Sequence, residues 1–366
     1  MNLRLLGWNE YFEQSFEPYR NQGLSPARVA RRDRTSWFLY HRDGEATGVL
    51  TGRFRRDILD TAEWPAVGDW VAISPAEPPS PAVIHGVLPR QTCLSRKAAN
   101  SGGMPDSGGR TDEQVLAANI DTAFLVSGLD LDFNVRRLER YLAVAYDCGA
   151  RPVVLLNKCD LREDVEAVMA EVEDVAMGVD ILAISAAEGT GMEQLDQFLE
   201  GNQTIVLLGS SGVGKTTIIN RLLGGGTLKT GEVRESDSRG RHTTTWREMI
   251  LLPSGGVLID TPGMRELQTW INEEGLKHTF EDIETLATDC RFRDCQHRGE
   301  PGCAVEAAVE SGELDAERLQ SYHKLVKELQ RLEERRSSKA AHIEKLRGKQ
   351  MGTMIREVKK FKKNRR

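Results

Sequence analysis

Residues 209–216 read GSSGVGKT and fit the pattern G-x-x-x-x-G-K-[ST]. The apolar run 204–208 precedes this octapeptide, and the segment 217–223 after it has a helical pattern. In a strand–loop–helix unit, glycines let backbone N–H groups turn toward a phosphate, and the helix N-terminus adds a partial positive charge. The sequence therefore predicts a phosphate-binding loop rather than an ordinary glycine-rich turn, and the residues assigned to it are Gly209, Ser210, Ser211, Gly212, Val213, Gly214, Lys215, Thr216 and Thr217.

The phosphate loop and one other segment carry side chains suited to phosphoryl chemistry. We expect Lys215 to bridge the β- and γ-phosphates and the Thr216 hydroxyl to coordinate Mg²⁺. Asp260 follows the apolar run 256–259 and is placed to hold the same Mg²⁺ through water. Gly263 closes the sequence Asp-Thr-Pro-Gly and can offer its N–H to the γ-phosphate. These four residues are therefore candidates for the catalytic site.

The tetrapeptide Asn157-Lys158-Cys159-Asp160 follows the apolar run 152–156 and points to the base. Guanine carries two neighbouring donors, N1–H and N2–H₂, and the Asp160 carboxylate can accept from both. Adenine lacks these donors and would leave the carboxylate unpaired. Asn157 would brace the loop, and the Lys158 stem would lie along the base plane. Alone, the tetrapeptide could be a helix-capping turn, but beside a phosphate loop it indicates GTP and GDP as ligands.

Two further segments complete the expected nucleotide site. Ser185 and Ala186 follow the next apolar run and, with the residue after them, would offer a backbone N–H to guanine O6. In the polar, glycine-rich loop 224–245, a threonine such as Thr243 or Thr244 would close over the metal ion when GTP is bound. The base-reading segments precede the phosphate loop, whereas ordinary GTPases have the reverse order. This order indicates a circular permutation.

A second chemical motif lies near the C-terminus, where Cys290, Cys295, His297 and Cys303 form the pattern C-x₄-C-x-H-x₅-C. Three thiolates and one imidazole complete a tetrahedral Zn²⁺ site with no open position for a substrate. We interpret the motif as a single structural zinc site. The alternative is a chance grouping of reduced cysteines and a surface histidine.

The pattern of apolar runs separates the chain into units. From residue 121 onward, strand-like runs alternate with helical segments, which is typical of a largely parallel sheet covered on both faces. The runs expected to be strands are 123–126, 152–156, 181–184, 204–208 and 256–259. Between 36 and 96, short β-type runs broken by Gly and Pro indicate a small barrel or sandwich. We expect an α/β protein with an N-terminal extension (1–35), a β-barrel domain (36–112), a permuted GTPase domain (113–270), a mainly helical zinc-binding domain (271–340) and a basic tail (341–366).

Composition excludes several classes of protein. With 39% hydrophobic residues and only 6 cysteines in 366 residues, the chain is neither disordered throughout nor a disulfide scaffold. It has no apolar run of about 18 residues and no secretory signal, so we expect a cytoplasmic protein that does not bind membranes. The net charge is −6, yet the segment 345–366 has ten basic residues and one acidic residue. This tail and the arginine-rich segment 20–56 could be solvated faces or nucleic-acid contacts.

The tryptophans in the β-rich region allow two interpretations. Trp37, Trp64 and Trp70 could stack on RNA bases or fill the core of a small barrel. We favour the core, because aromatic residues in small barrels are more often buried.

The segment 289–305 reads DCRFRDCQHRGEPGCAV. With the permuted motif order and the β-rich region before it, this segment resembles the ribosome small-subunit-dependent GTPase A family of bacterial circularly permuted GTPases. The resemblance covers most of the chain, from about Thr35 to the C-terminus. It implies an N-terminal OB-fold that binds RNA, a P-loop GTPase domain and a C-terminal zinc domain. It also implies binding to the 30S ribosomal subunit and its rRNA, GTP hydrolysis stimulated by that subunit, and assistance in its late maturation.

The resemblance also bears on catalysis. Many GTPases orient water with a glutamine directly after the D-x-x-G motif, but this chain has Met264 there, as family members have an apolar residue. His242, in the polar loop, resembles the histidine proposed to orient water in the family. The alternative is that His242 is a loop residue without a chemical role.

Three functions remain to be compared. The first is a GTPase that acts on the small ribosomal subunit, and we expect it to be a monomer. The second is an ATP-using enzyme such as a kinase, against which Asp160 argues. The third is an RNA-binding protein, with a partner other than the ribosome or with a purely structural nucleotide site. The intact set of Lys215, Thr216 and Asp260 argues against a purely structural site.

Overall fold

The computed structural model describes most of the chain, namely residues 1–58, 60–77, 79–97, 113–131, 133–224, 248–260, 272–331 and 333–334. Four residues expected at the nucleotide site, His242, Thr243, Thr244 and Gly263, lie outside the described residues. The expected basic tail also lies outside them. Within the described ranges, no helix combines the length and the apolar character that crossing a membrane requires.

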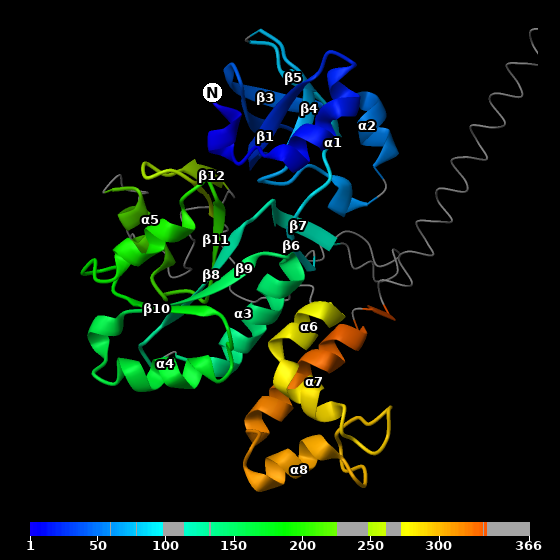
Figure 1. The fold of residues 1–366 in the computed structure, drawn as a ribbon. Helices are drawn as coiled ribbons and strands as arrows, with labels where there is room; N and C mark the ends of the chain where they lie inside the picture. Colours follow the sequence, from blue (N-terminus) through cyan, green and yellow to red (C-terminus); the bar gives the residue numbers. More distant parts are fainter. Residues whose placement is uncertain are drawn as a thin grey trace, which may run out of the picture.

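A closed five-stranded barrel forms the N-terminal part of the chain (Figure 1). Its strands are β1 (Ser25–Arg32), β2 (Trp37–His41), β3 (Gly44–Leu50), β4 (Trp70–Ser74) and β5 (Ala82–Val87). They follow the order β1-β2-β3-β5-β4, and β4 closes the barrel on β1. All neighbours are antiparallel except β3 and β5, which are parallel. The structure confirms the expected OB-type barrel.

Two of the three tryptophans are buried, but in different places. Trp37 lies in the interior cluster of the barrel, as the core interpretation predicts. Trp70 is buried on the other face of β4, outside that cluster. Helix α1 (Glu10–Arg20) places Phe12 and Phe16 in one cluster with Trp70. A short helix, α2 (Gly52–Asp57), lies between β3 and β4. The N-terminal helix was not expected, because its buried face consists of only two aromatic residues in a polar segment.

Strand β1 lies inside the segment assigned from the sequence to an N-terminal extension, so the barrel begins before residue 36. This strand carries Arg28, whose side chain is fully buried. Its guanidinium donates to the carbonyl oxygens of Gly68 (3.1 Å), Asn119 (3.0 Å) and Leu6. Burial lowers the pKa of Arg28 to about 10. Arg28 thus joins the barrel to the N-terminal segment and to the chain that leaves the barrel.

A second group of strands forms the parallel sheet expected from the sequence. They are β8 (Thr122–Gly128), β9 (Arg151–Asn157), β10 (Asp180–Ile184), β11 (Thr204–Leu208), β12 (Glu248–Leu251) and β13 (Val257–Asp260). Their order is β10-β9-β8-β11-β13-β12, and only β12 at the end is antiparallel to its neighbour in this group. All five runs expected to be strands are strands.

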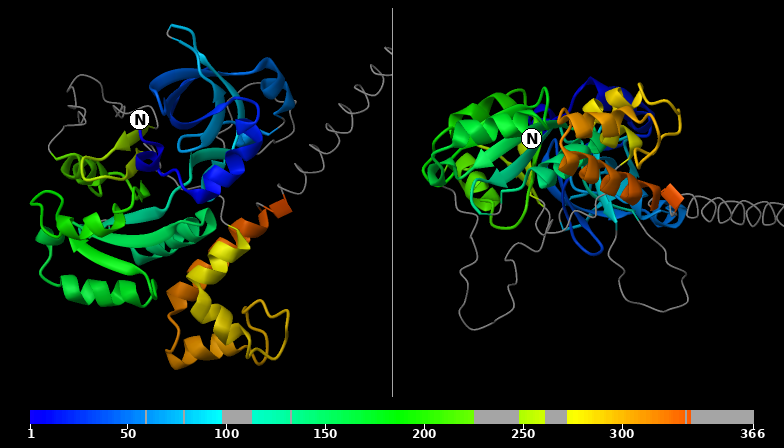
Figure 2. Two further views of the ribbon diagram at one scale, coloured as in Figure 1. Left: turned by 45° about the horizontal axis from the view of Figure 1, so that its top comes forward. Right: turned by 90° about the horizontal axis from the view of Figure 1, so that it is seen from below.

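Helices cover both faces of this sheet, as Figure 2 shows. Helices α3 (Val135–Cys148) and α4 (Val165–Glu173) pack on one face. Helix α5 (Lys215–Leu222) and the 3₁₀ turn at Met192–Phe198 pack on the other. The prediction of a doubly covered sheet is therefore confirmed.

Two connections join the barrel to this sheet. Strand β12 pairs with β1 of the barrel, so that one sheet of eleven described strands runs through both units. Separately, β6 (Cys93–Lys97) and β7 (Glu113–Ala118) form a two-stranded antiparallel sheet between them. The sequence did not indicate the pairing of β12 with β1, because it joins residues far apart in the chain.

The C-terminal unit is helical and packs on α3 (Figure 1). It contains α6 (Glu273–Thr279), α7 (Glu281–Ala287), α8 (Ala304–Ser311) and a helix over 316–331. At the contact between α3 and α6, a Cβ on Gly275 would lie 2.6 Å from the Ala143 carbonyl oxygen. Only glycine allows the two helices to approach this closely.

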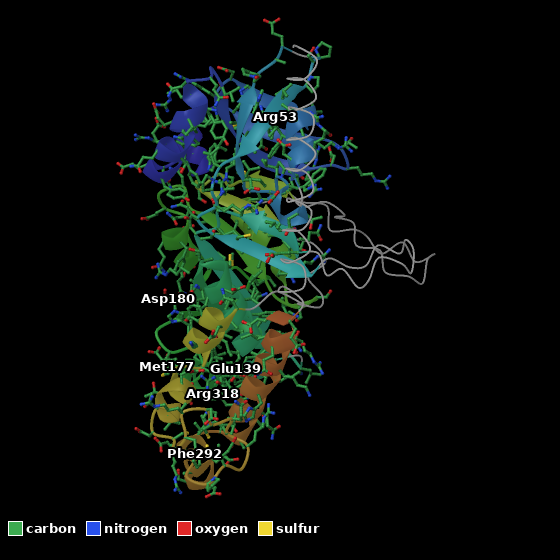
Figure 3. The ribbon with its side chains drawn as sticks, turned by 90° about the vertical axis from the view of Figure 1, so that its right-hand side faces the viewer. Arg53, Glu139, Met177, Asp180, Phe292 and Arg318 are labelled. Atoms are coloured by element: carbon green, nitrogen blue, oxygen red, sulfur yellow. The ribbon has the colours of Figure 1, made fainter. Side chains whose placement is uncertain are left out.

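A buried ion network holds this unit against α3 (Figure 3). The Glu139 side chain is 0% exposed and accepts hydrogen bonds from Arg318 (2.9 Å) and Arg136 (2.5 Å). Arg318 also makes two bonds of 2.7 Å to Asp282 and one of 3.0 Å to the Thr279 carbonyl. The network links α3, both helices α6 and α7, and the helix over 316–331.

We expect Arg318→Met to lower the free energy of unfolding by about 3 kcal/mol, because it leaves the Glu139 carboxylate buried with one cation fewer. Denaturant unfolding measures the loss. Arg140→Met is the matched control: its two bonds to Glu328 lie on a more exposed part of the same interface, with side chains 23% and 39% exposed. Its loss should stay below about 1 kcal/mol. Equal losses in both variants would contradict the prediction.

Candidate functional site

The expected phosphate loop connects β11 to α5 at the edge of the sheet where the parallel strands end. Asn157 ends β9 and Asp260 ends β13, and the parallel register brings these strand ends to the same edge. Ligands of open α/β sheets bind at this edge. The structure therefore gathers segments that the sequence places at 157, 209–216 and 260.

Two glycines of the loop are required by close packing. A Cβ on Gly214, whose φ is +99°, would lie 2.2 Å from the Asn157 Nδ2 atom. A Cβ on Gly209 would lie 2.5 Å from the carbonyl oxygen of Val126. Thus glycine is needed at these two positions of the motif for the loop to pack against β8 and β9.

Asn157 connects the phosphate loop to the segment 185–187, which is expected to read the base. Asn157 is buried, with 2% of the residue exposed. Its Nδ2 donates to the Val213 carbonyl (2.7 Å). Its Oδ1 accepts from the Ala186 N–H (3.0 Å). One side-chain amide therefore joins two loops that are far apart in the chain, the phosphate loop and the segment 185–187, as expected if Asn157 braces the site.

The segment 185–187 is held by further bonds. Arg221 on α5 donates from Nε to the Ala186 carbonyl (2.9 Å) and also bonds to the Ala187 carbonyl. The Ser185 N–H donates to the Thr190 carbonyl (2.9 Å). Since the Ala186 N–H is engaged by Asn157, the N–H groups of Ser185 and Ala186 both serve the protein. Arg221 was not identified from the sequence, because an arginine within a helix carries no specific signal.

The remaining residues expected to read the base lie in the turn after β9. Lys158 adopts a left-handed conformation with φ +66°, and its Nζ lies 2.5 Å from the Asp130 carboxylate. The following 3₁₀ turn, Cys159–Leu161, presents Asp160 as an exposed side chain. An exposed carboxylate next to a fixed lysine stem leaves Asp160 accessible to a base.

Charge at the phosphate loop comes from Lys215 and Asp260. The Lys215 ammonium donates to the carbonyls of Gly209 (2.7 Å) and Ser210 (2.6 Å). Burial lowers the pKa of Lys215 to about 8, although the nearby Asp260 carboxylate opposes the shift. Burial also raises the pKa of Asp260, while Lys215 acts to lower it and Glu248 to raise it. Among the described residues, the hydrogen bonds of this half-buried cation go to neutral carbonyls of the loop, so it is suited to receive anionic oxygens.

The lowered pKa of Lys215 predicts a pH dependence of nucleotide binding. In the free protein the pKa of Lys215 is about 8. Phosphate oxygens favour the charged ammonium, so Lys215 should keep its proton to a higher pH when nucleotide is bound. GDP affinity should be constant below pH 8 and should fall above it, by at most about tenfold per pH unit. Calorimetric titration from pH 6.5 to 9 measures this. In Lys215→Arg the cation stays charged and the fall should disappear; an equally steep fall there would contradict the assignment.

The four residues of the Cys/His motif come together in the C-terminal unit. The ligand atoms of Cys290, Cys295, His297 and Cys303 all lie within 4.8 Å of one another. The His297 Nδ1 atom lies 3.6 Å from the Cys290 sulfur and 3.4 Å from the Cys303 sulfur, and these two sulfurs are 3.9 Å apart. Ligands bound tetrahedrally at about 2.0–2.3 Å would lie about 3.5–3.8 Å apart. The cluster therefore fits a tetrahedral metal ion.

Local structure orients these ligands. His297 has a left-handed backbone, with φ +56°, and its carbonyl accepts from His323 Nε2 (3.0 Å). The Cys303 sulfur accepts from the Glu306 N–H (3.4 Å) at the start of α8. This bond fixes the direction of the Cys303 sulfur.

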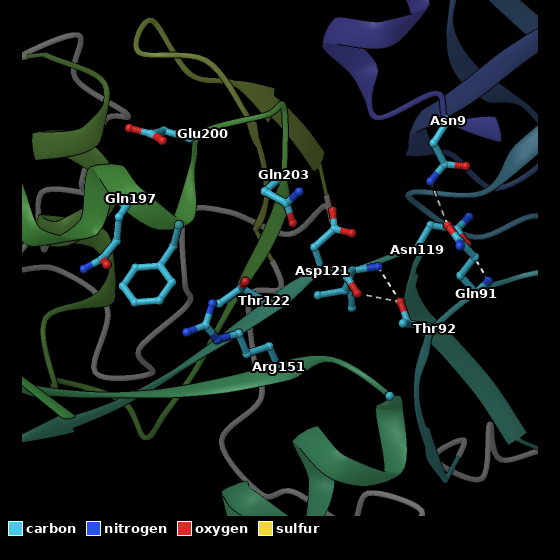
Figure 4. A pocket seen from close by; sticks show the side chains of 13 residues that line it. Asn9, Gln91, Thr92, Asn119, Asp121, Thr122, Arg151, Gln197, Glu200 and Gln203 are labelled. Carbon is cyan, nitrogen blue, oxygen red and sulfur yellow. Dashed lines mark hydrogen bonds between the residues drawn. The ribbon is translucent and has the colours of Figure 1, made fainter. Parts of the chain in front are cut away.

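A cavity of about 520 Å³ lies at the opposite edge of the sheet, where the strands begin (Figure 4). Its walls include Asp121, Arg151 and Gln203, near the starts of β8, β9 and β11. Several of its polar side chains are bonded to one another or to backbone, as Asn9 is to Gln91 (3.0 Å). The cavity belongs to the junction with the barrel and not to the edge that carries the phosphate loop.

Comparison with known proteins relates the chain to one family. The model of the RsgA GTPase family matches residues 87–270. A protein of Opitutus terrae named small ribosomal subunit biogenesis GTPase RsgA is 46% identical over 338 residues, covering 90% of each chain. A protein of the same name from Methanosarcina acetivorans is 41% identical over 360 residues, covering 98% of this chain and 94% of that protein.

Solved structures show the same fold. The crystal structure of YjeQ from Thermotoga maritima superposes with a TM-score of 0.61 and 27% identity, covering 84% of this chain and 98% of that chain. A structure titled as the circularly permuted GTPase YloQ gives a TM-score of 0.58 at 24% identity, over 84% of this chain and 95% of that chain. The likeness to YloQ concerns the fold alone.

Proposed function

The chain belongs to the RsgA GTPase family. We propose that it binds the 30S ribosomal subunit, hydrolyses GTP to GDP and phosphate when that subunit stimulates it, and assists late maturation of the subunit. The names of its relatives support the ribosomal part of the proposal. The observation that carries the GTP part is the position of Asn157, which bonds to the phosphate loop and to the segment 185–187 at once.

In this proposal the nucleotide lies along the edge formed by the ends of β9, β11 and β13. Asp160 accepts from guanine N1–H and N2–H₂, and the Lys158 stem lies along the base. Since the N–H groups of Ser185 and Ala186 are engaged, the Ala187 N–H is the donor to guanine O6. The Lys215 ammonium exchanges the carbonyls of Gly209 and Ser210 for phosphate oxygens.

Magnesium would be held by the Thr216 hydroxyl and, through water, by Asp260, with a threonine of 243–244 closing over it. A bound Mg²⁺ offsets the charge of the phosphates. The Gly263 N–H donates to the γ-phosphate. We assign the orientation of the attacking water to His242, because it resembles the histidine proposed for this role in the family. Met264, at the usual glutamine position, cannot polarise water.

The proposal assigns one structural Zn²⁺ to Cys290, Cys295, His297 and Cys303, because three thiolates and an imidazole suit this ion and leave no ligand position open. We place the protein in the cytoplasm, where it acts as a monomer. The basic segment 345–366 and the basic residues of 20–56 other than the buried Arg28 contact rRNA phosphates.

Hydrolysis of GTP by the full chain tests the proposal, measured alone and with 30S subunits, 50S subunits or free RNA. Strong stimulation by 30S subunits only is the expected result. Equal rates under all four conditions would remove the ribosome from the mechanism and favour the alternative, a nucleotide-regulated RNA-binding protein with another partner.

The role of His242 has its own test. We expect His242→Ala to lower the stimulated turnover while leaving GDP affinity unchanged, because the histidine acts on the water and not on the nucleotide. Stimulated hydrolysis and GDP titration on the same protein separate these effects. Full stimulated turnover in the variant would show that His242 has no chemical role.

A further inference from the structure

Three charged residues form one row across three neighbouring strands. In the register of the sheet, Glu248 on β12 lies opposite Arg31 on β1 and also opposite Asp260 on β13. Residues directly opposite each other point to the same face of a sheet, about 4.5–5.5 Å apart at Cβ. The row therefore leads from the barrel to the carboxylate next to the phosphate loop.

The face of the sheet that carries this row is the one covered by α5. On β12 and β13, Met249 and Ile259 pack into the cluster on the α3 side. Their neighbours Ile250 and Leu258 pack into the cluster that contains the α5 residues. Since side chains alternate along a strand, Glu248 and Asp260 share the face of Ile250 and Leu258.

The row contains two negative charges, on Glu248 and Asp260, and one positive charge, on Arg31. Glu248 and Asp260 are like charges on opposing positions, an arrangement that is unfavourable without a cation nearby. The Arg31 guanidinium lies 3.4 Å from the Glu248 carboxylate, and 3.5 Å from that of Asp33. It also lies over the Phe38 ring, 5.3 Å from its centre, which fixes its direction. The barrel thus supplies the positive charge next to Glu248.

We propose that Arg31 is a positioning residue for the nucleotide site: by pairing with Glu248 it offsets the negative charge beside Asp260, so the barrel sets how strongly the site attracts phosphate. The proposal rests on the proposed function of the site as a guanine nucleotide site. It gives the barrel a direct electrostatic connection to the phosphate loop, in addition to any contact with RNA.

The two partners of the ion pair must then act in opposite directions. Loss of Arg31 adds net negative charge near the phosphates and weakens nucleotide binding. Loss of the Glu248 charge removes negative charge and strengthens it. A merely structural pair, which only holds β1 against β12, would instead lose affinity in both variants.

The test is GDP binding by the full chain in Mg²⁺-free, low-salt buffer, so that the readout is the field at the phosphates and not turnover. We expect Arg31→Gln to weaken GDP by about three- to tenfold and Glu248→Gln to tighten it by a similar factor. The double variant should return close to wild type. At about 0.5 M salt the differences should shrink, because the Debye length falls to a few ångströms.

Arg53→Gln is the matched control, because Arg53 on α2 of the same barrel is 88% exposed and pairs only with Asp57 among the described residues (Figure 3). It should bind GDP as wild type does, and thermal unfolding of each variant checks the fold. Weakening in both Arg31→Gln and Glu248→Gln, or no change in Arg31→Gln, overturns the proposal. If wild type itself binds no GDP even with Mg²⁺, the proposed function fails, and this inference with it.

Discussion

Asp160→Asn should weaken GDP binding by roughly a hundredfold or more, because the amide accepts from guanine N1–H but turns a donor toward the N2–H₂ donor. The same change should strengthen binding of xanthosine diphosphate. Xanthine keeps N1–H and has a carbonyl at C2, so it matches the acceptor and donor of asparagine. Competition of both nucleotides for the wild-type and variant proteins measures the change in selectivity.

Asp164→Asn provides the matched control, since this nearby carboxylate is bonded to Arg162 (2.8 Å) and exposed. It should leave both affinities unchanged. If Asp160→Asn binds the two nucleotides as wild type does, the base is read elsewhere, and the assignment of the turn after β9 is wrong.

Loss of the metal site should have the largest effect on stability. Structural Zn²⁺ contributes about 10–16 kcal/mol of apparent binding energy in small zinc domains, which is comparable with the stability of a whole domain. Cys303→Ser should therefore lose the bound zinc and lower the melting temperature of the C-terminal unit, with faster amide exchange across α8. Metal analysis, calorimetry and hydrogen exchange measure these three changes, and wild type should contain one zinc per chain.

Cys93→Ala is the control, because this cysteine on β6 lies outside the cluster. It should keep the zinc content of wild type. A Cys303→Ser protein with unchanged zinc content, or a wild type without zinc, would contradict the assignment of this ion.

The local motifs could be predicted because their function depends on residues close together in the chain. The phosphate loop lies between a strand and a helix as expected, and Gly209 and Gly214 occupy positions where a side chain would collide with Val126 or Asn157. The four candidate metal ligands fall within one short segment, and the structure brings their donor atoms together. In both cases the spacing along the chain almost fixes the geometry.

Two features could not be predicted because they depend on charged residues that are buried. Strand β1 was missed since it contains several arginines, and one of them, Arg28, is in the core. In a sequence, an arginine is normally assigned to the surface. Here three backbone carbonyls accept hydrogen bonds from the Arg28 guanidinium, which allows its burial. The burial of the Glu139–Arg318 ion pair was not predicted either, because both residues are charged and would normally be assigned to the surface.

From the sequence alone we could predict the candidate nucleotide and metal motifs, their permuted order and the alternation of strands and helices. How the units meet depends on contacts seen only in the folded chain: the pairing of β12 with β1, the Asn157 bonds between two loops, and the packing of Gly275 against α3. These contacts join residues far apart in the chain. They depend on which surfaces fit together after the elements have formed, and no local pattern of residues encodes that fit.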